Sequence, residues 1–279
     1  MCFRWRSLGL VLVLLFLGAW FATAAEPLRL VMQDGGWGGA PTNNIRAVLL
    51  SAGGEIWRHC PHTRLAEIRV HHRGDYPQTN WERGKDGRIV IGLNTSDTYW
   101  AQYAYQFAHE FCHALATHSD DWEIKWRAGG KPNHWLEESL CETASLFALR
   151  AMGRSWAKSP PYSNWKSFAP ALTNYAQQRL DEPKHKLPPD TEFRAWFRAE
   201  EASLRTHSTQ REKNGIIAAQ LLPLFEAEPR GWETVTFLNL GTRDKKMSLA
   251  AFLAEWQMNV SPELRPFVAK VAMVFGVTL

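Results

Sequence analysis

Segments with strand character are confined to the first third of this chain, and the remaining two thirds have mostly helical character. Strands are expected near 28–33, 66–72 and 88–93, where alternating and β-branched residues gather. A helix is expected at about 41–59, because apolar residues recur there at helical spacing. Strands followed by helices are typical of the α+β class. The sequence therefore predicts an α+β fold with a small N-terminal sheet and a mostly helical C-terminal half.

Polar stretches with glycine or proline separate the expected elements. The stretch 74–87 is expected to be a loop, and 119–133 a connection between two helices. Further helices are expected at about 98–117, from 134 or 135 to near 153, at 165–180, at 191–207 and at 212–227, and in two segments near the C-terminus.

The composition excludes some classes of partner. The chain has 279 residues and a formal net charge of +4, and it contains no lysine or arginine tract. Nucleic acid and anionic membrane surfaces are therefore not expected as partners. The 45% hydrophobic content is ordinary for a globular protein that buries a core of normal size.

The N-terminus has the pattern of an export signal. Arg4 and Arg6 precede an apolar run at 8–21, and the small residues 22–24 come directly after it. We expect cleavage after this segment, which makes 1–25 a signal peptide and the mature protein secreted or periplasmic, without stable membrane insertion. An uncleaved membrane anchor is the alternative, although the run is short for a bilayer-spanning helix.

Three cysteines remain after removal of that segment: Cys60, Cys112 and Cys141. An odd number in an exported protein leaves at least one thiol free, buried or paired between chains. Cys112 and Cys141 lie on two successive expected helices. The sequence leaves two alternatives for this pair: a disulfide, or two small buried residues that pack between the helices.

The stretch His109-Glu110-Phe111-Cys112-His113 has the spacing of a metal site. Residues four positions apart lie on one face of a helix, so both imidazoles can reach a single ion. Glu110 can then take a proton from a metal-bound water. The alternative is a buried helix whose histidines bond to backbone carbonyls. An apolar stripe argues for the metal, because it gives the helix a separate packing face at Trp100, Tyr103, Phe107 and Phe111.

A catalytic zinc ion usually has three protein ligands, so one more donor is needed. The extended metzincin pattern would place a glycine at position 116 and a histidine at position 119. This chain has Ala116 and Ser119 there, which excludes that class. The acidic segment 132–142 on the next helix offers better donors.

Together the two segments resemble the gluzincin group of zinc metallopeptidases, the thermolysin-like superfamily, over residues 88–150. The second segment matches the group's Trp-Leu-x-Glu-(Gly/Ser) helix start at Trp135, Leu136, Glu138 and Ser139. The resemblance implies that Glu138 is the third metal ligand. It also implies that Glu142 holds a ligand histidine in the right tautomer, although many members have aspartate there. Glu137 points about 100° around the helix from Glu138 and is expected to be a solvated surface acid.

The resemblance further implies a zincin-like catalytic subdomain at 26–155, followed by a helical subdomain at 156–279. It implies one Zn²⁺ ion, a peptide or protein substrate, and Glu110 as the general base. The strand at 88–93 is expected to form the upper rim of the cleft. A second donor to the oxyanion is also needed. Tyr175 is the first candidate for this role, and the others are Tyr162 and His207.

Two other functions stay open. One is a zinc hydrolase that acts on a non-peptide substrate. The other is a catalytically silent binding protein that has kept the zincin fold. The simultaneous presence of His109, Glu110, His113 and Glu138 argues against the second.

Overall fold

A computed structural model describes residues 26–118, 131, 133–242, 244 and 246–279. The expected signal peptide at 1–25 and most of the connection at 119–133 lie outside the described residues. The described part has an α+β fold, as the sequence predicts, with a small sheet near the N-terminus and a helical second half.

The sheet has four strands in the order β1-β2-β4-β3. Their bounds are Leu30–Met32 for β1, Ile68–His72 for β2, Gln78–Thr79 for β3 and Ile89–Leu93 for β4. β1, β2 and β4 run parallel, and Ile68 lies opposite Ile89. Parallel neighbours require a crossover connection, which the helix α1 (Thr42–Trp57) provides between β1 and β2.

The expectation of a loop throughout 74–87 is wrong, because this stretch contains β3. Gln78 pairs with Gly92 of β4 in antiparallel register. β3 is an edge strand of two half-buried polar residues, so the alternation of apolar residues that marks a strand in a sequence is missing. The short strand matters because it lies beside the candidate site.

The other helices follow the sequence expectations closely. Their bounds are Trp100–His118 for α2, His134–Trp156 for α4, Ala169–Asp181 for α5, Phe193–Thr206 for α6, Arg211–Ala227 for α7, Trp232–Val235 for α8, Leu249–Asn259 for α9 and Arg265–Val274 for α10. Short 3-10 helices lie at Ser163–Phe168, Pro183–His185 and Pro229–Gly231.

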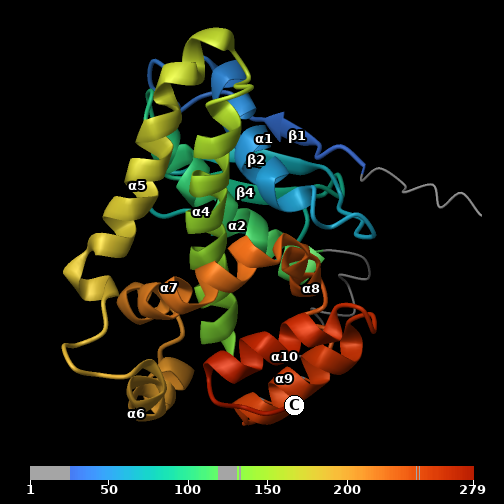
Figure 1. Ribbon diagram of the computed structural model, residues 1–279. Helices are drawn as coiled ribbons and strands as arrows, with labels where there is room; N and C mark the ends of the chain where they lie inside the picture. The colour runs from blue at the N-terminus through green and yellow to red at the C-terminus, as the bar shows by residue number, and fades with distance from the viewer. Residues whose placement is uncertain (1–25, 119–130, 132, 243, 245) are drawn as a thin grey trace, which may run out of the picture.

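α4 is the central helix of the molecule (Figure 1). It packs against α1 and α2 on the side of the sheet and against α5 and α7 on the other side. The aromatic stripe of α2 is buried as expected, at Trp100, Tyr103, Phe107 and Phe111. This packing fixes the rotation of α2 and leaves its histidine face for the candidate site.

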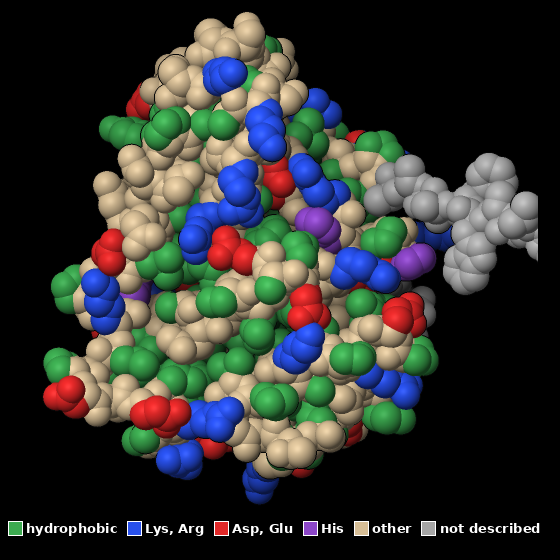
Figure 2. All heavy atoms as spheres, viewed as in Figure 1, with side chains coloured by type: hydrophobic (Ala, Val, Ile, Leu, Met, Phe, Trp, Pro, Cys, Tyr) green, Lys and Arg blue, Asp and Glu red, His purple; other side chains and the backbone are tan. Residues whose placement is uncertain are grey.

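One hydrophobic core runs through the described residues, from Leu30 to Phe275. The expected boundary after residue 155 falls at the last turn of α4, and the division into two subdomains stays a prediction. On the face seen in Figure 2, basic and acidic side chains are interspersed. No helix in the described ranges is both long and apolar enough to cross a membrane.

The three described cysteines are free thiols, and all are buried. Cys112 and Cys141 lie within hydrogen-bonding reach between α2 and α4. Of the two possibilities raised by the sequence, the structure therefore has small buried residues packed between helices.

Candidate metal centre

α2 presents His109 and His113 on one face, one turn apart, toward α4. Their ring centroids are 5.1 Å apart. Both side chains are mostly buried, with 17% and 16% exposed, and both line a cavity of about 420 Å³. The helical spacing of the sequence therefore brings the two imidazoles together.

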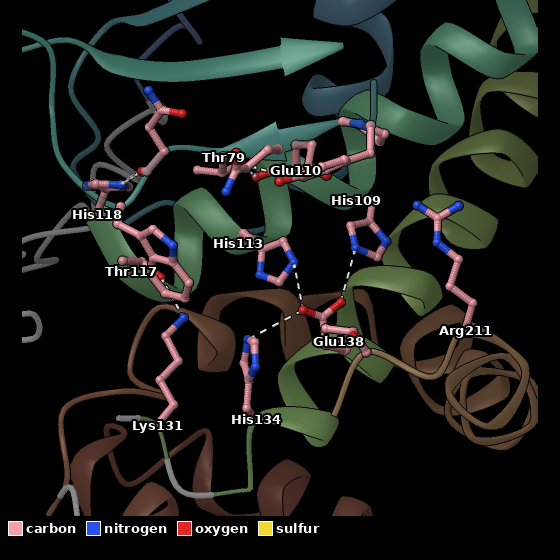
Figure 3. Close-up of a pocket in the computed structure, with 16 residues that line it drawn as sticks. Thr79, His109, Glu110, His113, Thr117, His118, Lys131, His134, Glu138 and Arg211 are labelled. Atoms are coloured by element: carbon pink, nitrogen blue, oxygen red, sulfur yellow. Dashed lines mark hydrogen bonds and ion pairs between the residues drawn. The ribbon is translucent and has the colours of Figure 1, made fainter. Parts of the chain in front are cut away.

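Glu138 of α4 points its carboxylate toward both imidazoles (Figure 3). Its Oε2 lies 3.5 Å from His109 Nε2, and its Oε1 lies 3.6 Å from His113 Nε2. Two atoms that bind one zinc ion at about 2.0–2.1 Å with tetrahedral geometry lie roughly 3.3–3.4 Å apart. The Glu138 carboxylate therefore lies at ligand spacing from each imidazole, with one oxygen toward each Nε2 atom.

The other ring nitrogen of each histidine faces a second carboxylate. His109 Nδ1 lies 3.7 Å from Glu142 Oε2, and Glu142 also accepts a hydrogen bond from the Tyr105 hydroxyl. His113 Nδ1 lies 2.8 Å from Glu137 Oε1. A carboxylate at Nδ1 fixes the tautomer and the ring orientation, so that Nε2 is the nitrogen left for a metal.

The expectation that Glu137 is a solvated surface acid is wrong. Its side chain is 2% exposed, and its carboxylate also accepts hydrogen bonds from Lys131 Nζ at 2.6 Å and from Asn239 Nδ2 at 2.9 Å. The expectation assumed that α4 has a single buried face. Because α4 is central and buried nearly all round, a rotation of about 100° leads to another buried face. The uncharged run over 143–149 was the sequence signal for such a helix.

The charges of this cluster are strongly coupled. Burial lowers the pKa of His109, but the Glu138 and Glu142 carboxylates outweigh it and raise the pKa to about 9. The pKa of His113 is likewise raised against burial, by Glu138 and Glu137. For the three carboxylates, burial raises the pKa and the neighbouring positive charges outweigh it and lower the pKa. A divalent cation can replace the two imidazole protons as the charge that balances these carboxylates.

Glu110 lies in the same cavity and is held by a residue of β3. The Thr79 hydroxyl lies 2.9 Å from Glu110 Oε2 and 2.7 Å from the Glu110 carbonyl oxygen, and it donates to these acceptors. Thr79 was not among the predicted site residues, because it lies in a polar stretch that was expected to be a loop. No local signal marks a contact between residues so far apart in the chain.

The rim of the cavity is formed by residues 76–81, which contain β3. The expectation that the strand at 88–93 forms the rim is therefore wrong. β4 lies one strand further in, because β3 pairs with it and takes the edge position. An edge strand has backbone N–H and C=O groups that are free to pair with another chain.

His134, the first residue of α4, also lies in the cavity. Its Nε2 lies 3.4 Å from Glu138 Oε1, and its Nδ1 lies 3.1 Å from Ser208 Oγ. Nε2 is buried and makes no hydrogen bond within the described part of the chain. His134 was not predicted as a site residue. It lies four positions before Glu138, and this helical spacing is the sequence signal that could have identified it.

Two sets of three ligand atoms lie within 4.8 Å of one another in the described residues, and the set of His109, His113 and Glu138 is not one of them. The two sets are His109, His113 and Cys141, and His113, His134 and Glu137. Buried groups in the described residues could therefore hold a metal ion in more than one way. Cys141 is fully buried and is not part of the cavity wall. Both oxygens of Glu137 already accept hydrogen bonds. Glu138 lines the cavity and faces three imidazoles, so it is the best-placed carboxylate.

Tyr175, on α5, does not line the larger cavity. It lines a smaller adjacent cavity with His109 and Glu142, and its ring packs edge-on against Tyr105 at 5.8 Å. Tyr162 and His207 line neither cavity. The structure thus places Tyr175 at the smaller cavity, which shares His109 with the larger one.

Comparisons with known proteins return no match: no family model, no curated protein and no solved structure is similar to this chain. The chemistry of the site is therefore inferred from its own side chains and their arrangement.

Proposed function

We propose that this protein is a zinc-dependent metallopeptidase with a zincin-like fold. His109, His113 and Glu138 hold one zinc ion, and Glu110 is the general base. The observation that carries the proposal is the convergence of two Nε2 atoms on one carboxylate, at 3.5 and 3.6 Å, beside a cavity that contains a further acid. Two imidazoles, one carboxylate and an open position are the donor set of catalytic zinc sites.

A bound zinc ion would supply a Lewis acid and a water whose pKa is lowered to about 7. With that ion bound, Glu110 would accept a proton from the attacking water and pass it to the leaving amine. The Thr79 hydroxyl supports this role, because it donates to Oε2 and leaves Oε1 for the water. The site thus has its own base already oriented by a second element.

His134 is the best-placed side chain for the second oxyanion donor, a role for which the sequence favoured Tyr175. When Nδ1 accepts a hydrogen bond from the Ser208 hydroxyl, the ring proton resides on Nε2. His134 lines the cavity, and its buried Nε2 lies 3.4 Å from Glu138 Oε1 and has no hydrogen-bond partner in the described residues. A donor aimed at the oxygen of the substrate carbonyl lowers the energy of the transition state.

A peptide substrate is supported by the edge strand. Both residues of β3 line the cavity and β3 is the edge strand of the sheet, where an extended peptide can add by main-chain hydrogen bonds. The scissile carbonyl would then pass over His109, His113 and Glu110. A small non-peptide substrate would make no use of this edge.

One observation favours a second candidate function. His134 Nε2 is as close to Glu138 as the other two imidazoles are, at 3.4 Å. As a fourth ligand it would complete a closed tetrahedral site, and closed sites are structural rather than catalytic. In that case the protein would bind zinc without hydrolysing peptides.

The test combines metal analysis of the purified protein with digestion of casein, whose cleavage products are identified by mass spectrometry. The wild-type protein is expected to hold one zinc ion and to cleave casein, and a chelator should abolish cleavage. Glu110→Gln should keep the zinc and lose hydrolysis, whereas Glu201→Gln on α6 should behave as the wild type. Hydrolysis by Glu110→Gln at the wild-type rate would refute the proposal.

His134→Ala separates the two candidates. In the peptidase it keeps the zinc and lowers kcat by about 10²–10³-fold, as removal of an oxyanion donor does. In the closed site it weakens zinc binding, and the wild-type protein shows no hydrolysis. Metal affinity and turnover of the same preparation therefore decide between them.

A further inference from the structure

Arg211, the first residue of α7, lies at one side of the candidate metal centre. Figure 3 shows its side chain beside His109, on the side opposite Lys131. It lines the larger cavity and also the smaller one, which has a volume of about 190 Å³. His109 and Pro77 line both cavities as well, so the two spaces adjoin at these residues.

Arg211 differs from the lysine and the other arginine that line the two cavities, because each of those forms an ion pair with a carboxylate. Lys131 has the Glu137 carboxylate at 2.6 Å, and Arg179 in the smaller cavity forms an ion pair with Glu182. Arg211 has no carboxylate within 4.0 Å and no side-chain hydrogen bond among the residues that the structure describes. Its guanidinium group is therefore available to an anionic ligand in the cavity.

A guanidinium group recognises a carboxylate through two parallel hydrogen bonds, and this geometry is specific as well as strong. The smaller cavity has less than half the volume of the larger one, and its wall carries Gln102 and the Arg179 guanidinium as well as the Glu142 carboxylate. Such a space suits the end of a peptide better than a continuing chain.

We infer that Arg211 binds the C-terminal carboxylate of the peptide substrate, so that the enzyme cleaves near free C-termini. This inference rests on the proposed peptidase function and names its substrate class. Arg211 is a specificity residue here: it holds one end of the substrate while the bond to be cleaved lies over His109 and His113.

The test compares one peptide in two forms, with a free C-terminal acid and with a C-terminal amide. For the wild-type enzyme, amidation is expected to lower kcat/KM by about 10–100-fold, the loss of a hydrogen-bonded charged group. Arg211→Gln should lower kcat/KM for the free acid by a similar factor and respond little to amidation. The matched control is Arg198→Gln on α6, an exposed arginine outside both cavities, which should retain the wild-type preference.

A third peptide shows whether Arg211 binds the C-terminal carboxylate or the carboxylate of an acidic side chain. It carries the amide and an aspartate in the penultimate position. If this peptide is cleaved as fast as the free acid, Arg211 binds the carboxylate of an acidic side chain and the inference is wrong. It is also wrong if the wild type cleaves acid and amide equally, or if Arg211→Gln slows both equally.

Failure of the inference differs from failure of the proposed function. Equal cleavage of acid and amide, with zinc bound and Glu110→Gln inactive, overturns the inference alone. The absence of cleavage of every peptide by the zinc-loaded wild type overturns both. Thermal unfolding of Arg211→Gln at the wild-type temperature confirms that the exposed substitution leaves the fold intact.

Discussion

Glu137→Gln tests the claim that a buried carboxylate both orients His113 and balances a buried cation. Glutamine has nearly the same shape but no charge. Lys131, whose side chain is 8% exposed, then lacks the carboxylate that lies at 2.6 Å in the wild type. Breaking a buried pair by removing one partner costs about 3–5 kcal/mol. A typical domain has a total stability of about 5–15 kcal/mol, so the effect is large.

The same substitution should weaken metal binding. His113 Nδ1 loses the acceptor that fixes its tautomer, and loss of such a partner costs about 10–100-fold in metal affinity. Urea denaturation of the metal-free protein measures the first effect, and chelator competition measures the second. The matched control is Glu228→Gln, whose exposed ion pair with Lys270 is expected to contribute less than about 1 kcal/mol.

A double variant separates the two roles. Lys131→Met in the Glu137→Gln background removes the cation that was left without its carboxylate, so part of the stability should return. Metal affinity should stay low, because His113 still lacks its partner. The reasoning is refuted if Glu137→Gln unfolds within about 1 kcal/mol of the wild type and binds zinc with unchanged affinity.

Three further predictions concern the edge strand, the core and α1. Thr79→Val removes the hydroxyl that orients Glu110, so kcat should fall about tenfold with unchanged zinc content, and unchanged turnover would contradict this role. Gly231→Ala would place a Cβ 2.2 Å from the Phe267 ring and should cost about 1–3 kcal/mol in urea denaturation. A Cβ added at Gly54 in α1 has no atom within 4 Å, so Gly54→Ala should instead stabilise the protein by up to about 1 kcal/mol. Destabilisation by this substitution would contradict the packing of α1.

Much of the fold was predictable because its signals are local. The helices and the parallel strands carry apolar periodicity, and their bounds fall within a few residues of those expected. β3 was missed because an edge strand of two polar residues has no such periodicity. Its position follows from pairing with β4, which is a contact between separate segments.

In the candidate site, too, some features follow from local sequence patterns and others depend on contacts between distant segments. That His109 and His113 share one helix face, with Glu110 beside them, follows from the sequence alone, because helical geometry fixes the relative direction of residues four positions apart. The burial of Glu137 and the hydrogen bond from Thr79 to Glu110 arise only when distant segments pack together. These roles depend on how α4 packs in the centre and how the sheet edge meets α2, and no local spacing encodes either arrangement.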